Sequence, residues 1–405
     1  MCSANNIFME PILELSQARM INAPKKFRRY LLENIPRDQR LVFISGARGT
    51  GKTTLLLQFL RSLGMPSSKA AYISLDDIIF SRLPAEDFAE WFISRGGEYL
   101  LIDEVHKLPQ WSVLIKTVYD RHPDIKIIIS GSSVLQVKKG EADLSRRMVT
   151  LHLNELSLRE FSVMKYDTDI KPFALDEILH DHERLTADVK SVIKPLMIFD
   201  EYLNHGAYPF FKEGARYFHE RLANAVNEVL ESDLPAVSGV TYSSVLKIKR
   251  MLAVLAESVP FIPNITELGA RAGVSRDLMY TYLYLLEKAG LIYQLRKESA
   301  GISMMSKPEK IYLHNTGLSR ALTLHETDRG ADRETFFINQ VSALHKVNWS
   351  EKGDFIVDGK YTFEIGGKNK SGKQIRDIRN SFIVKDDIEH GTGNIIPLWL
   401  FGFLY

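Results

Sequence analysis

Short apolar runs alternate with helical patterns in the first part of the chain. Runs rich in β-branched residues occupy Leu41–Ser45, Ala71–Leu75, Tyr99–Asp103 and Ile125–Gly131, and a fifth strand is predicted at Met148–Leu153. Because the apolar residues are nearly continuous rather than alternating with polar ones, the pattern is typical of strands covered on both faces, as in a parallel sheet.

Helical patterns separate these strands, at Thr53–Leu63, Ala85–Ser94 and Trp111–Arg121. Strands that alternate with helices predict a doubly wound α/β fold with a parallel sheet. We assign this fold to a first domain at residues 1–161.

The pattern changes in the rest of the chain. Residues 162–240 are mixed and polar and predict a helical connector or lid. Residues 241–329 predict three helices and a hairpin, which together describe a winged helix-turn-helix. The predicted elements are helices at Lys247–Ser258, Thr266–Arg271 (capped by Thr266) and Arg276–Ala289 (capped by Ser275 and ended by Gly290), and strands at Leu291–Arg296 and Lys310–His314.

Residues 330–405 predict a small α+β domain. A helix is predicted at Glu334–His345, strand-like pieces follow, and the apolar run Ile395–Tyr405 predicts a buried terminal strand. A cluster of potential metal ligands, His180-Asp-His182-Glu183, lies earlier in the chain. Nothing further along completes a site for it, so we interpret it as a solvated loop.

A glycine-rich loop follows the first strand. The segment Gly46-Ala-Arg-Gly-Thr-Gly51-Lys52-Thr53 matches G-x-x-x-x-G-K-[ST] between an apolar strand and a helix, as phosphate-binding loops do. Backbone N–H groups of such a loop and the positive end of the helix attract phosphate oxygens. The residues predicted to contact the nucleotide are Gly46, Ala47, Arg48, Gly49, Thr50, Gly51, Lys52, Thr53 and Thr54.

Two adjacent acids, Asp103 and Glu104, follow the third apolar strand. Asp103 and Thr53 are expected to hold Mg²⁺, while Lys52 is expected to contact the β- and γ-phosphates. Glu104 is placed to polarise the water that attacks the γ-phosphate. No N/T-K-x-D element is present where a GTPase would need it, so the sequence favours ATP over GTP.

Three further residues are candidates for γ-phosphate contacts. Ser130, at the end of the fourth strand, either contacts the γ-phosphate or the attacking water, or belongs to a Ser/Gly turn. Arg147, preferred over Arg146, either neutralises transition-state charge, in its own chain or in a neighbouring copy, or is a surface residue. If Arg147 acts on a neighbouring copy of the chain, the protein forms a homo-oligomer, which is one candidate assembly. Arg48 either touches phosphate or packs as a clamp on the loop.

Bulk composition narrows the setting. The 405 residues allow two or three domains, and the net charge of +2 gives no overall attraction to nucleic acid or membrane. A single cysteine, Cys2, fits a reducing cytosol. No secretory signal and no membrane-spanning run is recognisable, so a cytoplasmic protein without a membrane partner is expected.

The order of these motifs resembles a prokaryotic family of AAA-type ATPases that carry a winged helix and a C-terminal restriction-nuclease-like domain. The resemblance covers nearly the whole chain and rests on Gly46–Thr54, Tyr99–Trp111, Ile129–Ser133, Arg147, Leu156–Phe161, Tyr202–Pro209 and the predicted winged helix. It implies a nuclease-like fold for residues 330–405. Since the role of most family members is unknown, the resemblance does not define the output of the ATPase.

A restriction-type nuclease needs a helix Glu, a strand Asp and Glu-x-Lys on the next strand, so that the acids hold Mg²⁺ and the lysine activates water. The matching positions are Glu334, Asp354 and Glu364, but Lys368 is displaced by two glycines. Lys368 or Lys370 would reach the site only through a bend at the glycines. We therefore expect residues 330–405 to have a nuclease-like fold that does not cleave DNA.

The predicted winged helix offers a surface for DNA or for protein. The N-terminal turn of the segment Ser275–Tyr284 would enter the major groove of DNA. However, this helix carries few positive charges, mainly Arg276 and Lys288. Three functions remain open. The first is a hydrolytic ATPase that acts as a conformational switch for its C-terminal domains. The others are an ATP-regulated metal-dependent DNA nuclease and a binding module with vestigial hydrolysis.

Overall fold

The computed structural model describes residues 2–132, 144, 146–258, 260, 265–298, 307–323 and 327–405. The chain divides into two compact units. Unit 1 comprises residues 1–154 and 236–238, and unit 2 comprises residues 155–235 and 239–405. The finer division into four domains stays a prediction.

Unit 1 contains a five-stranded parallel sheet. Its strands are β1 (Leu41–Gly46), β2 (Ala70–Ser74), β3 (Tyr99–Asp103), β4 (Lys126–Ser132) and β5 (Val149–His152), in the order β2-β3-β4-β1-β5. Every residue of β1, β2 and β3 is buried, as expected for strands covered on both faces. The predicted α/β fold with a parallel sheet is confirmed. β1, which leads into the glycine-rich loop, and β3, which ends at Asp103, flank β4, which carries Ser130.

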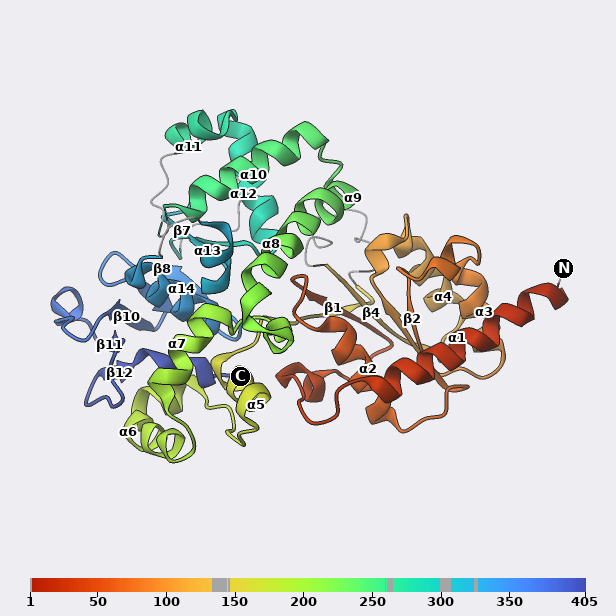
Figure 1. Ribbon diagram of the computed structural model, residues 1–405, viewed down its shortest axis with the longest axis horizontal. Coiled ribbons are helices and arrows are strands. Elements are labelled where there is room, and N and C mark those ends of the chain that lie inside the picture. Colours follow the sequence, from red (N-terminus) through yellow and green to blue (C-terminus); the bar gives the residue numbers. More distant parts are fainter. Residues whose placement is uncertain are drawn as a thin grey trace. The chain divides into compact units, whose positions relative to one another are not determined.

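Helices cover both faces of this sheet (Figure 1). They are α2 (Lys52–Leu63), α3 (Ala85–Ser94) and α4 (Trp111–Arg121), each within one residue of its predicted bounds. On one face, Leu56 and Phe59 of α2 pack in a core cluster with Val42 and Ile44 of β1. On the other face, the ring of Phe43 lies 6.4 Å from that of Trp111 in α4.

A helix that the sequence pattern did not predict begins unit 1. α1 (Cys2–Asn22) contacts the edge strand β2 and α2. The Ser16 hydroxyl accepts a hydrogen bond from the backbone N–H of Tyr72 at 2.9 Å, and Arg19 makes two 2.7 Å hydrogen bonds to Asp77. α1 therefore covers part of the edge of the sheet.

The first part of unit 2 is helical. Its elements are α5 (Leu158–Tyr166), α6 (Leu175–Val192), α7 (Pro195–His205), α8 (Phe218–Glu228) and a π-helical turn (Val229–Asp233). The short helix α9 (Leu234–Ser238) follows, and its last three residues belong to unit 1. All residues from 158 to 240 are described and none lies in a strand, so the predicted helical character of the connector is confirmed. The cluster His180–Glu183 lies within α6 and His182 is buried, so the predicted solvated loop is wrong. The helical period of the flanking apolar residues outweighs the polar cluster.

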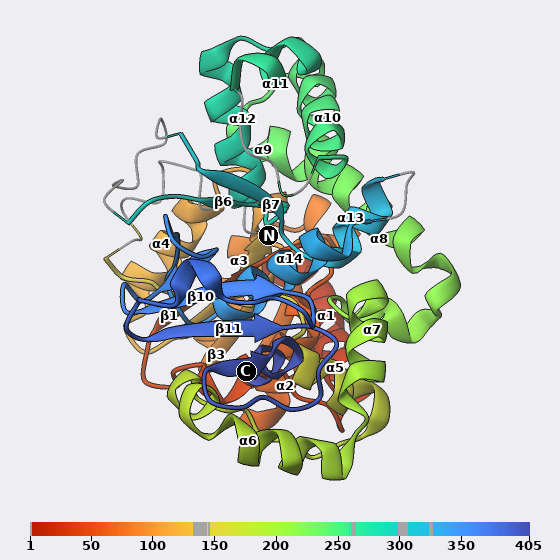
Figure 2. The ribbon, with the colours of Figure 1, turned by 90° about the vertical axis from the view of Figure 1, so that its left-hand side faces the viewer.

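Three helices and a hairpin follow, as predicted. They are α10 (Tyr242–Ala256), α11 (Ile265–Ala272), α12 (Arg276–Lys288) and the antiparallel pair β6 (Ile292–Leu295) and β7 (Lys310–Leu313). α10, α11 and α12 pack as one group (Figure 2). α11 begins at Ile265, so Thr266 lies inside the helix rather than at its predicted cap. Ser275 precedes α12 without a side-chain capping hydrogen bond.

A mixed sheet ends unit 2, after α13 (Thr316–Leu322) and α14 (Arg329–Val341). Its strands β8 (Val347–Trp349), β9 (Phe355–Val357), β10 (Tyr361–Gly366), β11 (Ser381–Lys385) and β12 (Ile395–Pro397) lie in the order β12-β11-β10-β9-β8. β10, β11 and β12 are parallel to one another, whereas β8 and β9 are antiparallel to their neighbours.

Two predictions for this region need correction. The helix starts at Arg329 rather than Glu334, because the Asp328 side chain caps it by accepting the N–H of Ala331. The buried terminal run is a strand only to Pro397 and continues as a 3₁₀-helix, Leu398–Phe403. Proline lacks the N–H that a ladder needs, so the strand ends there.

Within the described part of the chain, no helix is both long and apolar enough to span a bilayer.

Candidate functional site

The glycine-rich loop joins the C-terminal end of β1 to the first turn of α2. Gly49 and Gly51 have φ values of 84° and 95°, which side chains other than glycine rarely adopt. A Cβ on Gly46 would come within 2.6 Å of the carbonyl oxygen of Leu153. The backbone of the loop therefore requires glycine at these three positions.

Internal hydrogen bonds hold the loop in shape. The buried Lys52 ammonium donates to the carbonyl oxygens of Gly46 and Ala47, at 3.1 Å each. Arg29, which sequence reasoning did not single out, donates from its guanidinium to the carbonyl oxygens of Thr50 and Asn154. The charge of Lys52 is thus directed at the concave side of the loop, where an anion would compete with the two carbonyls.

Asp103 gathers hydrogen-bond donors from four places. Its Oδ2 accepts from the Thr53 hydroxyl at 2.6 Å and from the Tyr72 hydroxyl at 2.8 Å. Its Oδ1 accepts from the Ser130 hydroxyl and from the backbone N–H of Glu104. α2, β2, β3 and β4 thus converge on one buried carboxylate. Ser133, three residues after Ser130 in the predicted motif, lies outside the described residues.

Tyr72 is the member of this cluster that the sequence did not reveal. Burial, followed by the negative charge of Asp103, raises the pKa of the Tyr72 hydroxyl well above its usual value. The hydroxyl therefore keeps its proton and donates to Asp103 at any working pH. The signal in the sequence would have been a tyrosine in a buried strand of otherwise small or aliphatic residues.

Glu104 has a left-handed backbone, with φ 55° and ψ 43°, which is uncommon for a residue other than glycine. Its carboxylate Oε2 lies 3.2 Å from Nε2 of the buried His106, while its side chain stays 23% exposed. Such strained positions concentrate at functional sites. Glu104 is thus partly accessible at the edge of the sheet where Asp103 ends β3.

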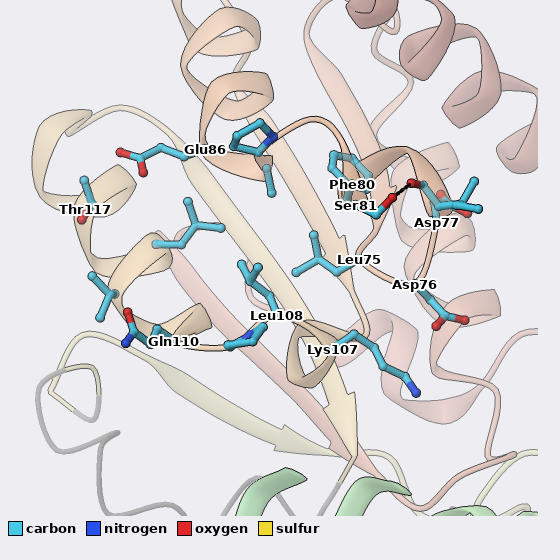
Figure 3. Close-up of a pocket in the computed structure, with 16 residues that line it drawn as sticks. Leu75, Asp76, Asp77, Phe80, Ser81, Glu86, Lys107, Leu108, Gln110 and Thr117 are labelled. Atoms are coloured by element: carbon cyan, nitrogen blue, oxygen red, sulfur yellow. Dashed lines mark hydrogen bonds between the residues drawn. The ribbon is translucent and has the colours of Figure 1, made fainter.

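A cavity of about 510 Å³ adjoins these residues. Thr53, Tyr72, Asp103 and Glu104 line it, together with Arg19, Asn22, Ala23, Arg48, Leu57, Ser74, Asp76, Asp77 and Lys107. A second cavity of about 530 Å³ shares Asp76, Asp77 and Lys107 with the first (Figure 3). The C-terminal ends of the strands therefore border open space beside Asp103 and Glu104. The charged residues that the two cavities share lie where the cavities meet.

Arg147 lies at the other end of the sheet. It precedes β5, in which Val149 pairs with Val42 near the start of β1, and its guanidinium lies 3.3 Å from Asp120 near the end of α4. The glycine-rich loop leaves the opposite end of β1, four residues beyond Val42, or about 13 Å at 3.3 Å per strand residue. Arg147 is thus not brought together with Lys52, Asp103 and Glu104 of its own chain. Arg48 does line the first cavity.

Oxygen ligands suit Mg²⁺, and the Thr53 hydroxyl and Asp103 carboxylate offer two on adjoining elements. These two residues fit a Mg²⁺ bound partly by substrate phosphates. Among the described residues, no group of three or more His, Cys, Asp or Glu side chains could hold a metal by itself.

The three acids of the predicted nuclease site in unit 2 are each engaged by lysine. Lys310 lies 3.1 Å from Glu334 and 3.7 Å from Asp354, so one lysine contacts both acids. The buried Glu364 lies 3.2 Å from Lys370, whereas the side chain of Lys368 is exposed. The lysine that reaches Glu364 is thus Lys370.

Two family models match parts of the chain. Residues 38–162 match the family model of the AAA domain, and residues 197–329 match that of a domain of unknown function. No curated protein matches the chain.

Similar solved structures include AMPPCP-bound DnaA from Aquifex aeolicus, at 16% identity over 64% of this chain and 85% of that one, with a TM-score of 0.28. They also include the replication initiator DnaA bound to AMPPCP and single-stranded DNA, at 15% identity over 69% and 91%, with a TM-score of 0.31. The S. cerevisiae Hsp104–ADP complex is similar at 17% identity over 68% and 40%, with a TM-score of 0.31.

The match to the AAA model spans all five strands of the parallel sheet, the glycine-rich loop and both acids. The chain therefore contains an AAA-type domain, a nucleotide-binding P-loop fold. This class applies to residues 38–162.

Proposed function

We propose that this protein binds ATP with Mg²⁺ and hydrolyses it to ADP and phosphate. The observation that carries the proposal is the 2.6 Å contact between the Thr53 hydroxyl, in the first turn of α2, and the carboxylate of Asp103. It joins the phosphate-binding loop to the acidic end of β3, so that a triphosphate and its metal would share one site.

The loop residues from Gly46 to Thr54 would bind the phosphates through backbone N–H groups. Lys52 would exchange its bonds to the Gly46 and Ala47 carbonyls for bonds to phosphate oxygens, because charge-assisted bonds to an anion are stronger. Thr53 and Asp103 would hold Mg²⁺, which neutralises phosphate charge when bound.

Glu104 is proposed as the group that orients the attacking water and accepts its proton. Its carboxylate is partly exposed and borders the cavity beside Asp103. Ser130 is proposed to support the site by fixing Asp103 until a γ-phosphate or water offers a competing partner. The cycle of binding and hydrolysis would then act as a conformational switch for the rest of the chain.

Arg147 is proposed to act on a neighbouring copy of the chain. Its place at the far edge of the sheet keeps it from the phosphates of its own loop, whereas a second copy could bring that edge to the loop of the first. A homo-oligomer is therefore part of the proposal. The alternative of an ATP-regulated nuclease has no support in the geometry, since Lys310 and Lys370 engage the acids it would need.

Phosphate release and ATP binding test the proposal together. We expect Glu104→Gln to bind ATP in calorimetry like wild type but to release phosphate at least about a hundredfold more slowly, the usual loss of a general base. We expect Lys52→Ala to show no ATP binding. A Glu104→Gln variant as fast as wild type would remove Glu104 from the mechanism. Absence of ATP binding by wild type would overturn the proposal.

A further inference from the structure

The connection from β10 to β11 concentrates positive charge. Residues 367–380, here called the basic crossover, contain a single acid, Asp377, and five basic residues. Those five are Lys368, Lys370, Lys373, Arg376 and Arg379. The formal charge of this segment is +4 in a chain whose total is +2, so the remaining residues carry a net negative charge. Neither the AAA-type domain nor the engaged acids of unit 2 account for this concentration.

Most of these charges are available to a partner. Lys370 lies 3.2 Å from the buried Glu364. The side chains of Lys368, Lys373, Arg376 and Arg379 are exposed, and none forms an ion pair with a carboxylate among the described residues. They are therefore not needed to neutralise acids of the fold.

The backbone of the crossover is anchored to the sheet. Ile375 is 1% exposed, and its carbonyl oxygen accepts from the Ser381 hydroxyl at 3.0 Å and from the N–H of Ile378 at 3.1 Å. Gly372 adopts φ 64° in close contact with Ile383, where a Cβ would not fit. Because the support is ordered, binding costs less conformational entropy than ordering a free basic tail would.

The other side chains of the crossover indicate which anion fits. No aromatic residue lies between residues 367 and 380, so the segment lacks the stacking platforms that bind single strands. Ile375 is buried and Ile378 partly buried, which leaves no exposed apolar anchor for a membrane surface. Exposed Lys and Arg among Ser, Asn and Gln side chains are typical of phosphate contacts along a duplex.

We propose that the basic crossover binds the phosphodiester backbone of double-stranded DNA without reading its sequence. Each contacting cation would release condensed counterions, so binding would weaken steeply with salt. The proposal does not depend on ATP hydrolysis, and it places the nucleic-acid surface on the β10–β11 connection rather than on the predicted winged helix.

Fluorescence anisotropy of the full chain with a short labelled duplex tests the proposal, at about 50 to 200 mM salt and without nucleotide. We expect the double variant Lys373→Gln with Arg376→Gln to bind about tenfold or more weakly. The slope of log K against log salt should fall in magnitude by about 1.8, the contribution of two phosphate contacts. Lys194→Gln with Lys346→Gln, which removes two exposed lysines elsewhere in unit 2, should leave both values unchanged.

Several outcomes would overturn the proposal. One is an equal loss of duplex affinity in the two double variants, and another is a wild-type chain that does not bind the duplex. A third is a loss of duplex affinity that occurs only in Arg276→Gln, a change in α12. Binding to phosphatidylserine vesicles in place of DNA would assign the surface to a membrane instead. Loss with the crossover variant alone, at an unchanged melting temperature, would support it.

Discussion

Asp103 illustrates how one residue can depend on several elements. It accepts hydrogen bonds from side chains of α2, β2 and β4 and from the backbone of its neighbour Glu104. Orientation of a metal-binding carboxylate by such partners typically matters almost as much as the ligand itself. The Tyr72 hydroxyl is the donor in this set that no nucleotide-binding motif contains.

Removal of that hydroxyl should loosen the proposed metal site. We expect Tyr72→Phe to raise the Mg²⁺ concentration needed for half-maximal ATP hydrolysis about tenfold, because Asp103 loses a donor that fixes its Oδ2. A Mg²⁺ titration of the ATPase rate measures this effect. Tyr99→Phe, which removes a hydroxyl from the other end of β3, is the control and should leave the titration unchanged.

An unaltered Mg²⁺ dependence in Tyr72→Phe, in a protein with the wild-type melting temperature, would contradict this role.

The residues of the candidate site also differ in how far the sequence predicts them. The spacing of Lys52, Thr53, Asp103 and Glu104 identified the motifs, because their chemistry depends on local sequence. Tyr72 and Arg29 contribute through long-range contacts that local patterns do not encode.

Among the elements of unit 2, the contact of α14 with the end of β11 rests on Asp386. Its Oδ2 accepts hydrogen bonds from Nε of Arg329 at 2.7 Å and from Nε of Arg333 at 2.9 Å. Burial alone would raise the pKa of Asp386, but hydrogen bonds from Arg329 and Arg333 and the charge of Arg329 outweigh it and hold the pKa below its usual value. Asp386 therefore stabilises the fold when it is ionised.

We expect Asp386→Asn to lower the free energy of unfolding by about 2 kcal/mol at neutral pH, the usual worth of hydrogen bonds to a charged group. Because the folded pKa is depressed, this stability is complete above the unfolded pKa of about 4 and is lost as the pH falls through the lower folded pKa. Urea unfolding across pH measures it. The gap between wild type and variant should stay constant above about pH 5 and shrink below about pH 4.

The exposed neighbour gives a matched control for this clamp. Asp387 lies 3.6 Å from Arg333 but is 58% exposed, so Asp387→Asn should cost little. Equal destabilisation by the two variants would show that the Asp386 contact has no special role.

Elements were predictable where the pattern was strong. β1–β4 and α2–α4 match their predicted bounds closely, since buried strands give continuous apolar runs and the helices that cover them are amphipathic. α1 escaped because its polar and apolar residues show no marked helical face, and it packs against an edge strand far along the chain. The sequence pattern predicts a start for α14 that is five residues too late, because the cap at Asp328 does not stand out in it.

At the scale of the whole molecule, the proposed role of Arg147 requires more than one copy. We expect Arg147→Ala to reduce ATP hydrolysis about a thousandfold, as for other arginines that reach a transferring phosphoryl group. A mixture of Arg147→Ala with the inactive Lys52→Ala should regain activity, because one variant supplies the intact loop and the other supplies the arginine. Phosphate release from the separate and mixed proteins measures this complementation.

Two results would exclude the role of Arg147 in a neighbouring copy. One is a wild-type rate in Arg147→Ala, and the other is a mixture no more active than its parts. Arg146→Ala, a change at the exposed residue next to it, is the control and should hydrolyse ATP like wild type.

The position of α1 has a consequence for shortened forms of the protein. β2 is an outer strand, and Ser16 engages one of its outward-facing N–H groups. Without α1, the outward-facing N–H of Tyr72 would lose its partner and this border of the sheet would be uncovered, which favours pairing with other polypeptide strands. Versions that start beyond Asn22 would therefore self-associate into insoluble material even though every nucleotide-binding motif is intact.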